Sequence, residues 1–114
     1  MSKAEQVNQV IKPLLGELIA SEVETPDFLI TVYNVKCAQD LSSAKVHVSI
    51  LPEKFSGTAL KRLRAKSGHL SKILKAKSGL NRVPKLFWYV DSSFKAVEKI
   101  NNIFDEIERE KEDV

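Results

Sequence analysis

A strict alternation of apolar and polar side chains from residue 44 to residue 50 limits the fold of this chain more than any other feature. The apolar phase consists of Ala44, Val46, Val48 and Ile50, and the polar phase of Lys45, His47 and Ser49. Because successive side chains of a strand point to opposite faces, this pattern predicts a strand in a sheet with one buried face and one face in water. Such a sheet needs other elements over its apolar face.

Two further segments have the composition of strands. Phe28 to Lys36 is rich in β-branched and aromatic residues, and residues 39–43 supply the turn chemistry that separates it from the alternating strand. We expect these two strands to form an antiparallel pair. Pro84 to Val90 predicts a third strand, which tolerates Pro84 because the proline opens it.

Helical periodicity begins at the N-terminus. Ser2 and Glu5 have the spacing of a capping box, and an apolar stripe with gaps of three and four residues follows them. The stripe consists of Val7, Val10, Ile11, Leu14, Leu15, Leu18 and Ile19. Pro13 lies inside it, so we expect a kink or a helix that restarts there.

Helical spacing returns between residues 60 and 78. The apolar positions are Leu60, Leu63, Leu70, Ile73 and Leu74. Ser67-Gly68 interrupts them, and glycine costs about 1 kcal/mol relative to alanine inside a helix, so we predict two helices that meet at a bend. Gly79 has the position of a C-cap. A last helix is predicted after Asp91 and Ser92, with its stripe at Phe94, Val97, Ile100, Phe104 and Ile107.

This order of elements predicts an α+β fold in which helices cover one face of a three-stranded sheet. With 114 residues, 43% of them hydrophobic, the chain suits one domain spanning residues 1–114, with residues 106–114 charged enough to fray. No apolar run approaches the roughly 18 residues of a membrane span, and the single Cys37 fits a reducing compartment. We therefore expect a cytoplasmic monomer without a membrane partner.

The cations are concentrated in one segment. Residues 54–90 carry ten Lys or Arg and no Asp or Glu, although the net charge of the whole chain is only +3. Like charges in one region repel each other, so this segment indicates a polyanionic partner that relieves the repulsion. The phosphates of nucleic acid are the default partner of this kind. The alternative is a protein-interaction module whose basic surface binds an acidic protein.

The sequence contains no pattern typical of a catalytic, metal or cofactor site. It has neither a nucleophile elbow nor a phosphate-binding glycine loop, so we expect no enzymatic activity and no cofactor. His47 and His69 do not have metal-site spacing relative to Cys37. Aromatic side chains of the third strand could stack on bases, but we expect at least two of the three to lie in the core. The three are Phe87, Trp88 and Tyr89.

Four short strings occur in a characteristic order: residues 23–27, residues 40–48, Ser67-Gly68, and residues 82–86 with the aromatic strand that follows. Together they resemble the ribosome-binding factor A family of bacterial small-subunit assembly factors. The resemblance implies a type II KH-like fold, with an interhelical kink at Lys66-Ser67-Gly68 in place of the usual Gly-x-x-Gly loop. It also implies binding to the immature small ribosomal subunit through its rRNA. The implied role is late maturation and rRNA processing, also during cold adaptation.

The chain departs from the family pattern near the kink. Lys66 stands where the family usually has alanine, and Ser71 stands where a basic residue is common, although Lys72 is adjacent. The basic segment and the resemblance together predict a set of RNA-contacting residues. These are Lys45, Arg62, Lys66, Ser67, Gly68, Lys72, Lys75, Lys77, Arg82 and Lys85.

Overall fold

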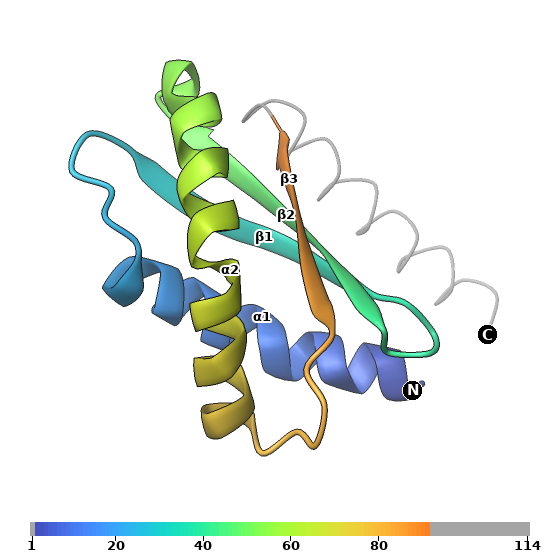
Figure 1. The fold of residues 1–114 in the computed structure, drawn as a ribbon. Helices are drawn as coiled ribbons and strands as arrows, with labels where there is room; N and C mark the ends of the chain where they lie inside the picture. The colour runs from blue at the N-terminus through green and yellow to red at the C-terminus, as the bar shows by residue number, and fades with distance from the viewer. Residues whose placement is uncertain (1, 92–114) are drawn as a thin grey trace, which may run out of the picture.

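In a computed structural model, residues 2–91 are described, and two α-helices there pack on one face of a three-stranded sheet (Figure 1). The elements are α1 (Lys3–Glu22), β1 (Leu29–Cys37), β2 (Ser43–Leu51), the 3-10 turn η1 (Glu53–Phe55), α2 (Ser56–Ser78) and β3 (Lys85–Asp91). The predicted α+β class is confirmed. The helix predicted from residue 94 onward, like the fraying expected at residues 106–114, lies outside the described residues.

The strand order is β1-β2-β3, so the alternating strand lies in the middle. β1 and β2 are antiparallel, as predicted, while β3 runs parallel to β2 after the crossover through α2. In β2, Ala44, Val46, Val48 and Ile50 are fully buried and Lys45 is exposed, which confirms the predicted faces. The helices therefore cover the apolar face of β2, and its polar face points away from them.

A β-bulge in β1 changes which side chains point toward the helices. Val32 pairs with Val48 but Asn34 pairs with His47, so Tyr33 is an extra residue in the ladder. The extra residue reverses the alternation: Val32 faces the core before the bulge, and Val35 faces it afterwards. Tyr33 thereby reaches the polar side of the sheet, where its hydroxyl donates a hydrogen bond to Oδ2 of Asp91.

Helix α1 begins at the predicted cap. Oγ of Ser2 accepts a hydrogen bond of 3.2 Å from the backbone amide of Glu5. The helix continues through Pro13 to Glu22, so the predicted restart at the proline is wrong. Pro13 is exposed, whereas Ile11 and Leu15 on either side are fully buried, and their packing holds the helix together across the missing amide.

Helix α2 is one continuous helix of 23 residues, so the prediction of two helices was wrong. Gly68 lacks a positive φ, and a Cβ added to it would meet nothing within 4 Å. The cost of one exposed glycine, about 1 kcal/mol, is smaller than the stabilisation from burying Leu63, Leu70 and Leu74 on either side of it. The predicted C-cap is confirmed, since Gly79 has a φ of 72° in the left-handed region.

The aromatic residues of β3 alternate across the sheet. Trp88 is buried with 7% of its surface exposed, whereas Phe87 and Tyr89 are 43% and 44% exposed. The prediction that at least two of the three lie in the core was wrong. Only Trp88 faces α2, because Lys85, Phe87 and Tyr89 share the opposite face of the strand.

Candidate nucleic-acid interface

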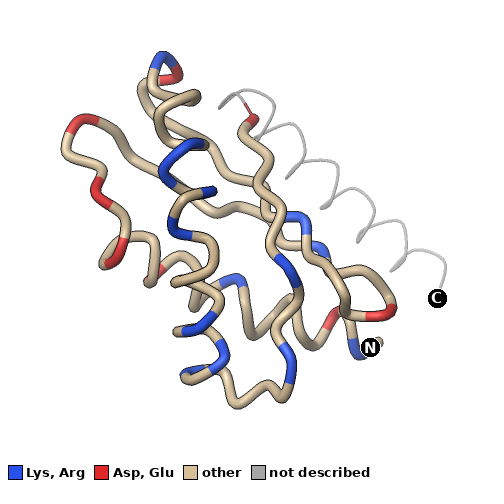
Figure 2. The backbone as a smooth tube through the Cα atoms, viewed as in Figure 1, with Lys and Arg blue, Asp and Glu red and all other residues tan. Residues whose placement is uncertain are grey.

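Residues 54–90, which contain no Asp or Glu, form α2, the loop after it and most of β3. Lys and Arg follow α2 from end to end and continue through the loop into β3, whereas Asp and Glu mark the end of α1 and the loop before β1 (Figure 2). The asymmetry along the sequence is therefore also an asymmetry in space. A surface of this kind attracts polyanions and raises their local concentration.

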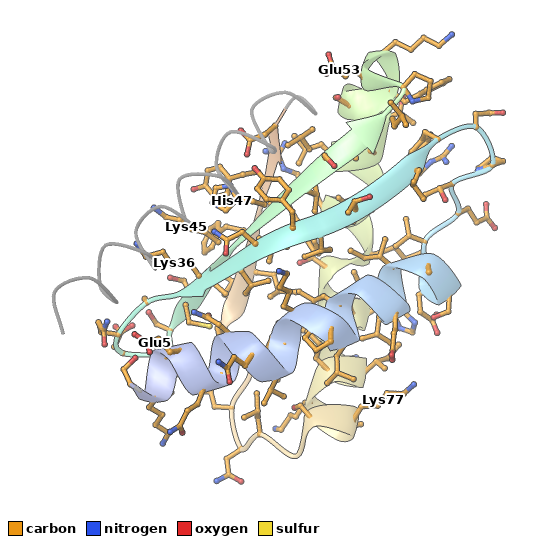
Figure 3. All side chains as sticks on the ribbon, turned by 180° about the vertical axis from the view of Figure 1, so that it is seen from behind. Glu5, Lys36, Lys45, His47, Glu53 and Lys77 are labelled. Carbon is orange, nitrogen blue, oxygen red and sulfur yellow. The ribbon has the colours of Figure 1, made fainter. Side chains whose placement is uncertain are left out.

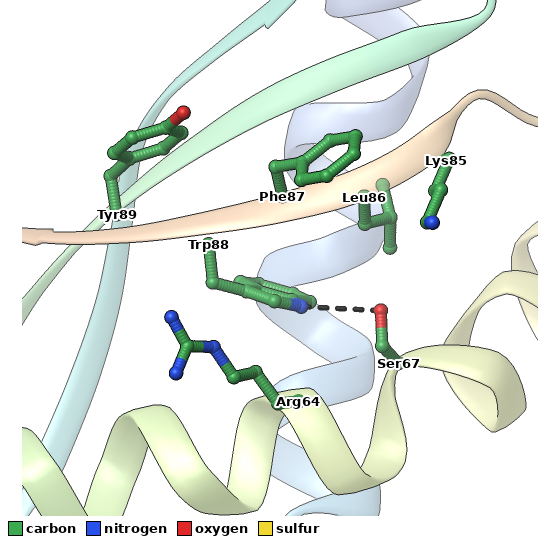
Figure 4. Close-up of a pocket in the computed structure, with 7 residues that line it drawn as sticks. All are labelled: Arg64, Ser67, Lys85, Leu86, Phe87, Trp88 and Tyr89. Atoms are coloured by element: carbon green, nitrogen blue, oxygen red, sulfur yellow. Dashed lines mark hydrogen bonds between the residues drawn. The ribbon is translucent and has the colours of Figure 1, made fainter.

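A groove with a volume of about 380 Å³ lies between β3 and α2 on this side. Arg64 and Ser67 line it from α2, and residues 85–89 line it from β3. Figure 4 shows Trp88 pointing from the strand toward the helix, with Arg64 beside it and Phe87 and Tyr89 on the other side of the strand.

A hydrogen bond between Trp88 and Ser67 joins the two elements that line the groove. Nε1 of the indole donates to Oγ of Ser67 over 3.2 Å (Figure 4). The hydroxyl accepts this bond and keeps its own hydrogen available as a donor. Ser67, predicted to contact RNA, therefore has a structural role as well, since it ties the middle of α2 to β3.

The backbone of β3 adds donors and acceptors to the groove. Among residues 2–91, no strand pairs with the edge of β3 that faces away from β2. The amide of Lys85 points toward β2, where it donates to the carbonyl of Ser42 over 3.1 Å. Because these groups alternate along a strand, the amides and carbonyls of Leu86 and Trp88 point to the open edge beside Arg64.

Helix geometry determines which cations accompany this groove. Arg64, Ser67 and Ser71 follow one another at intervals of three and four residues, and Lys75 continues the same row. Arg64 and Lys75 are both exposed. Of the predicted residues, Ser67, Lys75 and Lys85 thus lie at or beside the groove, and Gly68 is adjacent to Ser67.

Arg62 and Lys66 lie on the other side of α2. Both line a hollow next to the end of α1, together with Glu22 and Glu24. Nη1 of Arg62 donates to the carbonyl of Glu24 over 2.7 Å, and its guanidinium carbon is 5.4 Å from the ring centroid of Phe28. Arg62 is therefore held by contacts within the protein.

The remaining predicted cations are dispersed. Lys72 and Lys77 are exposed on α2, and Arg82 is exposed in the loop before β3. Lys45 lies on the face of the sheet turned away from the helices. Helix α2 is continuous through the predicted interhelical kink, so no helix begins at Gly68. No free amides of a helix N-terminus are therefore present there.

The predicted RNA-contacting set omits Arg64, and Phe87 and Tyr89, considered for base stacking but expected in the core, are exposed. Arg64 could have been found from its spacing, because three residues before Ser67 places it one turn away on the same side of the helix. The orientation of the aromatic residues had no signal in the sequence. Leu86 to Val90 is apolar in both phases, so alternation does not distinguish its two faces.

Both histidines of the described residues contact a carboxylate of another element. Nε2 of His69 is 3.1 Å from Oε2 of Glu22, and Nδ1 of His47 is 3.3 Å from Oδ2 of Asp91. Burial raises the pKa of the Cys37 thiol. Within residues 2–91, no group of three or more His, Cys, Asp or Glu side chains is placed to hold a metal ion, and no helix is long and apolar enough to cross a membrane.

These features define an α+β protein of the type II KH-like class, with a basic groove between one helix and the edge of its sheet. The chain belongs to the ribosome-binding factor A family, because a sequence model of that family matches residues 3–104.

Relatives of known name support this assignment over most of the chain. Ribosome-binding factor A of Mycoplasmopsis pulmonis is 34% identical over 110 residues, covering 96% of each chain. That of Pelagibacter ubique is 35% identical over 102 residues, covering 86% of this chain and 84% of the relative.

Two solved structures share the fold. The crystal structure of ribosome-binding factor A from Thermus thermophilus has a TM-score of 0.68 and 26% identity, covering 76% of this chain and 93% of the other. A homology model of the Thermus thermophilus factor, fitted into a cryo-EM map of a 30S complex, has a TM-score of 0.67 and 28% identity, covering 77% and 93%.

Proposed function

We propose that this protein is an assembly factor that binds the immature small ribosomal subunit through its rRNA and has no catalytic activity of its own. It acts as a cytoplasmic monomer and is needed for late small-subunit maturation and rRNA processing, also during cold adaptation. Family membership supports the ribosomal partner, because a relative from Thermus thermophilus has been fitted into the map of a 30S complex.

The observation that carries this proposal is the groove between α2 and β3. It combines an open strand edge, the Ser67 hydroxyl and the Arg64 guanidinium within a segment that contains no carboxylate. Strand amides and carbonyls can form hydrogen bonds with base edges and sugar hydroxyls, while the guanidinium forms paired hydrogen bonds with a phosphate. A protein partner would be bound through its acidic side chains and would not need the open edge.

The cations outside the groove have a different role. Lys61 and Lys72 lie on the solvent side of α2, where they raise the local concentration of RNA without fixing its position. The groove positions the RNA strand, and the surrounding field draws the subunit toward it. Affinity that depends on phosphate positions falls when the RNA refolds and moves them, so release needs no chemical step.

Co-sedimentation with purified precursor and mature small subunits across a salt series tests this function. We expect tighter binding to the precursor, with an affinity that falls steeply as the salt concentration rises. Heparin serves as the control polyanion. Equal binding to heparin and to both subunits would contradict the proposal. It would favour the alternative, a basic surface that binds an acidic protein and does not distinguish between polyanions.

A further inference from the structure

The face of the sheet turned away from α1 and α2, which we call the outer face, carries cationic and aromatic side chains. Both described helices pack on the opposite face (Figure 1). Figure 3 shows Lys36, Lys45 and His47 close together on the sheet, away from Lys77. The register places one further cation and two aromatic residues of β3 beside them, namely Lys85, Phe87 and Tyr89.

Two of these lysines are arranged unfavourably for the isolated protein. Lys36 and Lys45 are direct cross-strand partners on β1 and β2, and both are exposed. Like charges directly opposite each other destabilise a sheet. Lys45 also pairs with Phe87, so the same row across the sheet ends in an exposed ring. An anion bound near Lys36 and Lys45 would relieve their repulsion.

The exposed rings are held by their neighbours. Phe87 and Tyr89 are two residues apart and therefore share the outer face. Tyr89 stacks on His47 with ring centroids 5.3 Å apart and planes inclined by 22°. Nζ of Lys85 is 5.4 Å from the centroid of Phe87. Each ring is thus positioned on one side, yet more than two fifths of each residue remains exposed to a ligand.

We propose that the outer face is a second RNA site, which binds single-stranded RNA by stacking bases on Phe87 and Tyr89. Lys36 and Lys45 contact the phosphates of the same strand. Exposed rings on a strand next to cations are the arrangement with which sheet surfaces bind unpaired bases, since every base has a face that can stack. The choice of RNA as the ligand rests on the proposed function. The site shares Phe87 and Tyr89 with the lining of the groove, but Lys36 and Lys45 lie on the outer face and do not line the groove.

Fluorescence anisotropy with a labelled oligouridylate of about eight nucleotides tests this site. We expect Phe87→Ala and Tyr89→Ala each to weaken binding by about ten-fold. Lys36→Ala combined with Lys45→Ala should also weaken it and lower the salt dependence. Leu51→Ala is the matched control, because Leu51 is a 60% exposed apolar residue at the far end of β2. It should bind the oligouridylate as the wild-type protein does.

Arg64→Ala separates the outer face from the groove, because Arg64 lines only the groove. If Arg64→Ala loses the oligouridylate while the Lys36 and Lys45 variant keeps it, the strand binds in the groove and the proposal is wrong. The proposal is also wrong if the wild-type protein self-associates without binding oligouridylate and the Phe87 and Tyr89 variants do not self-associate. The outer face would then bind a second copy of this chain. If the wild-type protein does not bind small subunits, the proposed function is wrong. The oligouridylate measurement would still decide whether the outer face binds single-stranded RNA.

Discussion

Arg62 and Lys72 look alike in the sequence, but they differ in what they contact. Arg62 donates to the Glu24 carbonyl and lies over Phe28, whereas Lys72 is exposed on the solvent side of α2. We expect Arg62→Ala to lower the free energy of unfolding by about 1 to 2 kcal/mol, since it removes a charged hydrogen bond and a cation–π contact. Lys72→Ala should change it by less than about 0.5 kcal/mol.

Urea denaturation of both variants measures the difference. If the two midpoints shift equally, Arg62 has no structural role, and its earlier assignment to the RNA-contacting set regains support. The expected destabilisation by Arg62→Ala also matters for binding studies. A charge reversal at Arg62 mixes a loss of stability with a loss of positive charge, so Arg62 is a poor position for testing RNA contacts.

Gly68 is the second residue whose interpretation changes with the structure. It has no positive φ and has room for a methyl group, so Gly68→Ala should raise the free energy of unfolding by about 1 kcal/mol through helix propensity. We still expect weaker binding to precursor subunits with an unchanged salt slope, because the methyl group would lie next to Ser67 without removing charge. A variant with unaltered thermal stability would show that α2 is strained at this position.

At the scale of elements, the strands could be predicted more completely than the helices. The alternation in β2 determined both its existence and its faces, because it is strict over seven residues. The bulge at Tyr33 was not predicted, because Thr31 is the one polar residue of β1 before the bulge and Asn34 and Lys36 follow it, which is too little to define two phases. The division of α2 predicted at Gly68 is wrong because the burial of Leu63 and Leu70 outweighs the low helix propensity of one glycine.

The candidate site could also be predicted only in part. The basic segment was evident from composition, and two of the predicted residues, Ser67 and Lys85, line the groove, while Lys75 continues the helix row of Arg64 and Ser67. The side of α2 to which each cation belongs depends on the position of β3, which is set by parallel pairing with β2 after a long crossover. That information is tertiary, so Arg62 and Lys66 could not be separated from Arg64 by composition.

The paired lysines of the sheet give a prediction at this scale. Lys36→Glu places opposite charges across from each other, because Lys36 and Lys45 are direct cross-strand partners. We expect the free energy of unfolding to rise by about 0.2 to 1 kcal/mol in low salt, with the gain shrinking as salt is added. Chemical denaturation at low and high salt measures it. A destabilised variant would mean that the two side chains do not interact.

The whole molecule separates positive charge from negative charge while keeping a modest net charge of +3. Helix α2 and β3 carry the cations on one side, and the end of α1 and its loop carry carboxylates on another (Figure 2). This arrangement orients the protein toward a polyanion as well as attracting it. Matches to family members extend over residues 3–104, so the groove lies within the part of the chain that the family shares.

The central claim is that the groove side of α2, and not its basic charge in general, positions rRNA. Two double variants of the same helix test it, and both remove two cations: Arg64→Ala with Lys75→Ala on the groove side, and Lys61→Ala with Lys72→Ala on the solvent side. All four residues are exposed, so both variants should fold as the wild-type protein does.

The measurement is the affinity for small-subunit rRNA across a salt series. We expect the groove-side variant to bind more weakly and to lower the slope of log affinity against log salt by nearly two contacts, while the solvent-side variant stays close to wild type. Equal losses in the two variants would contradict the claim, because a delocalised field would then account for the binding.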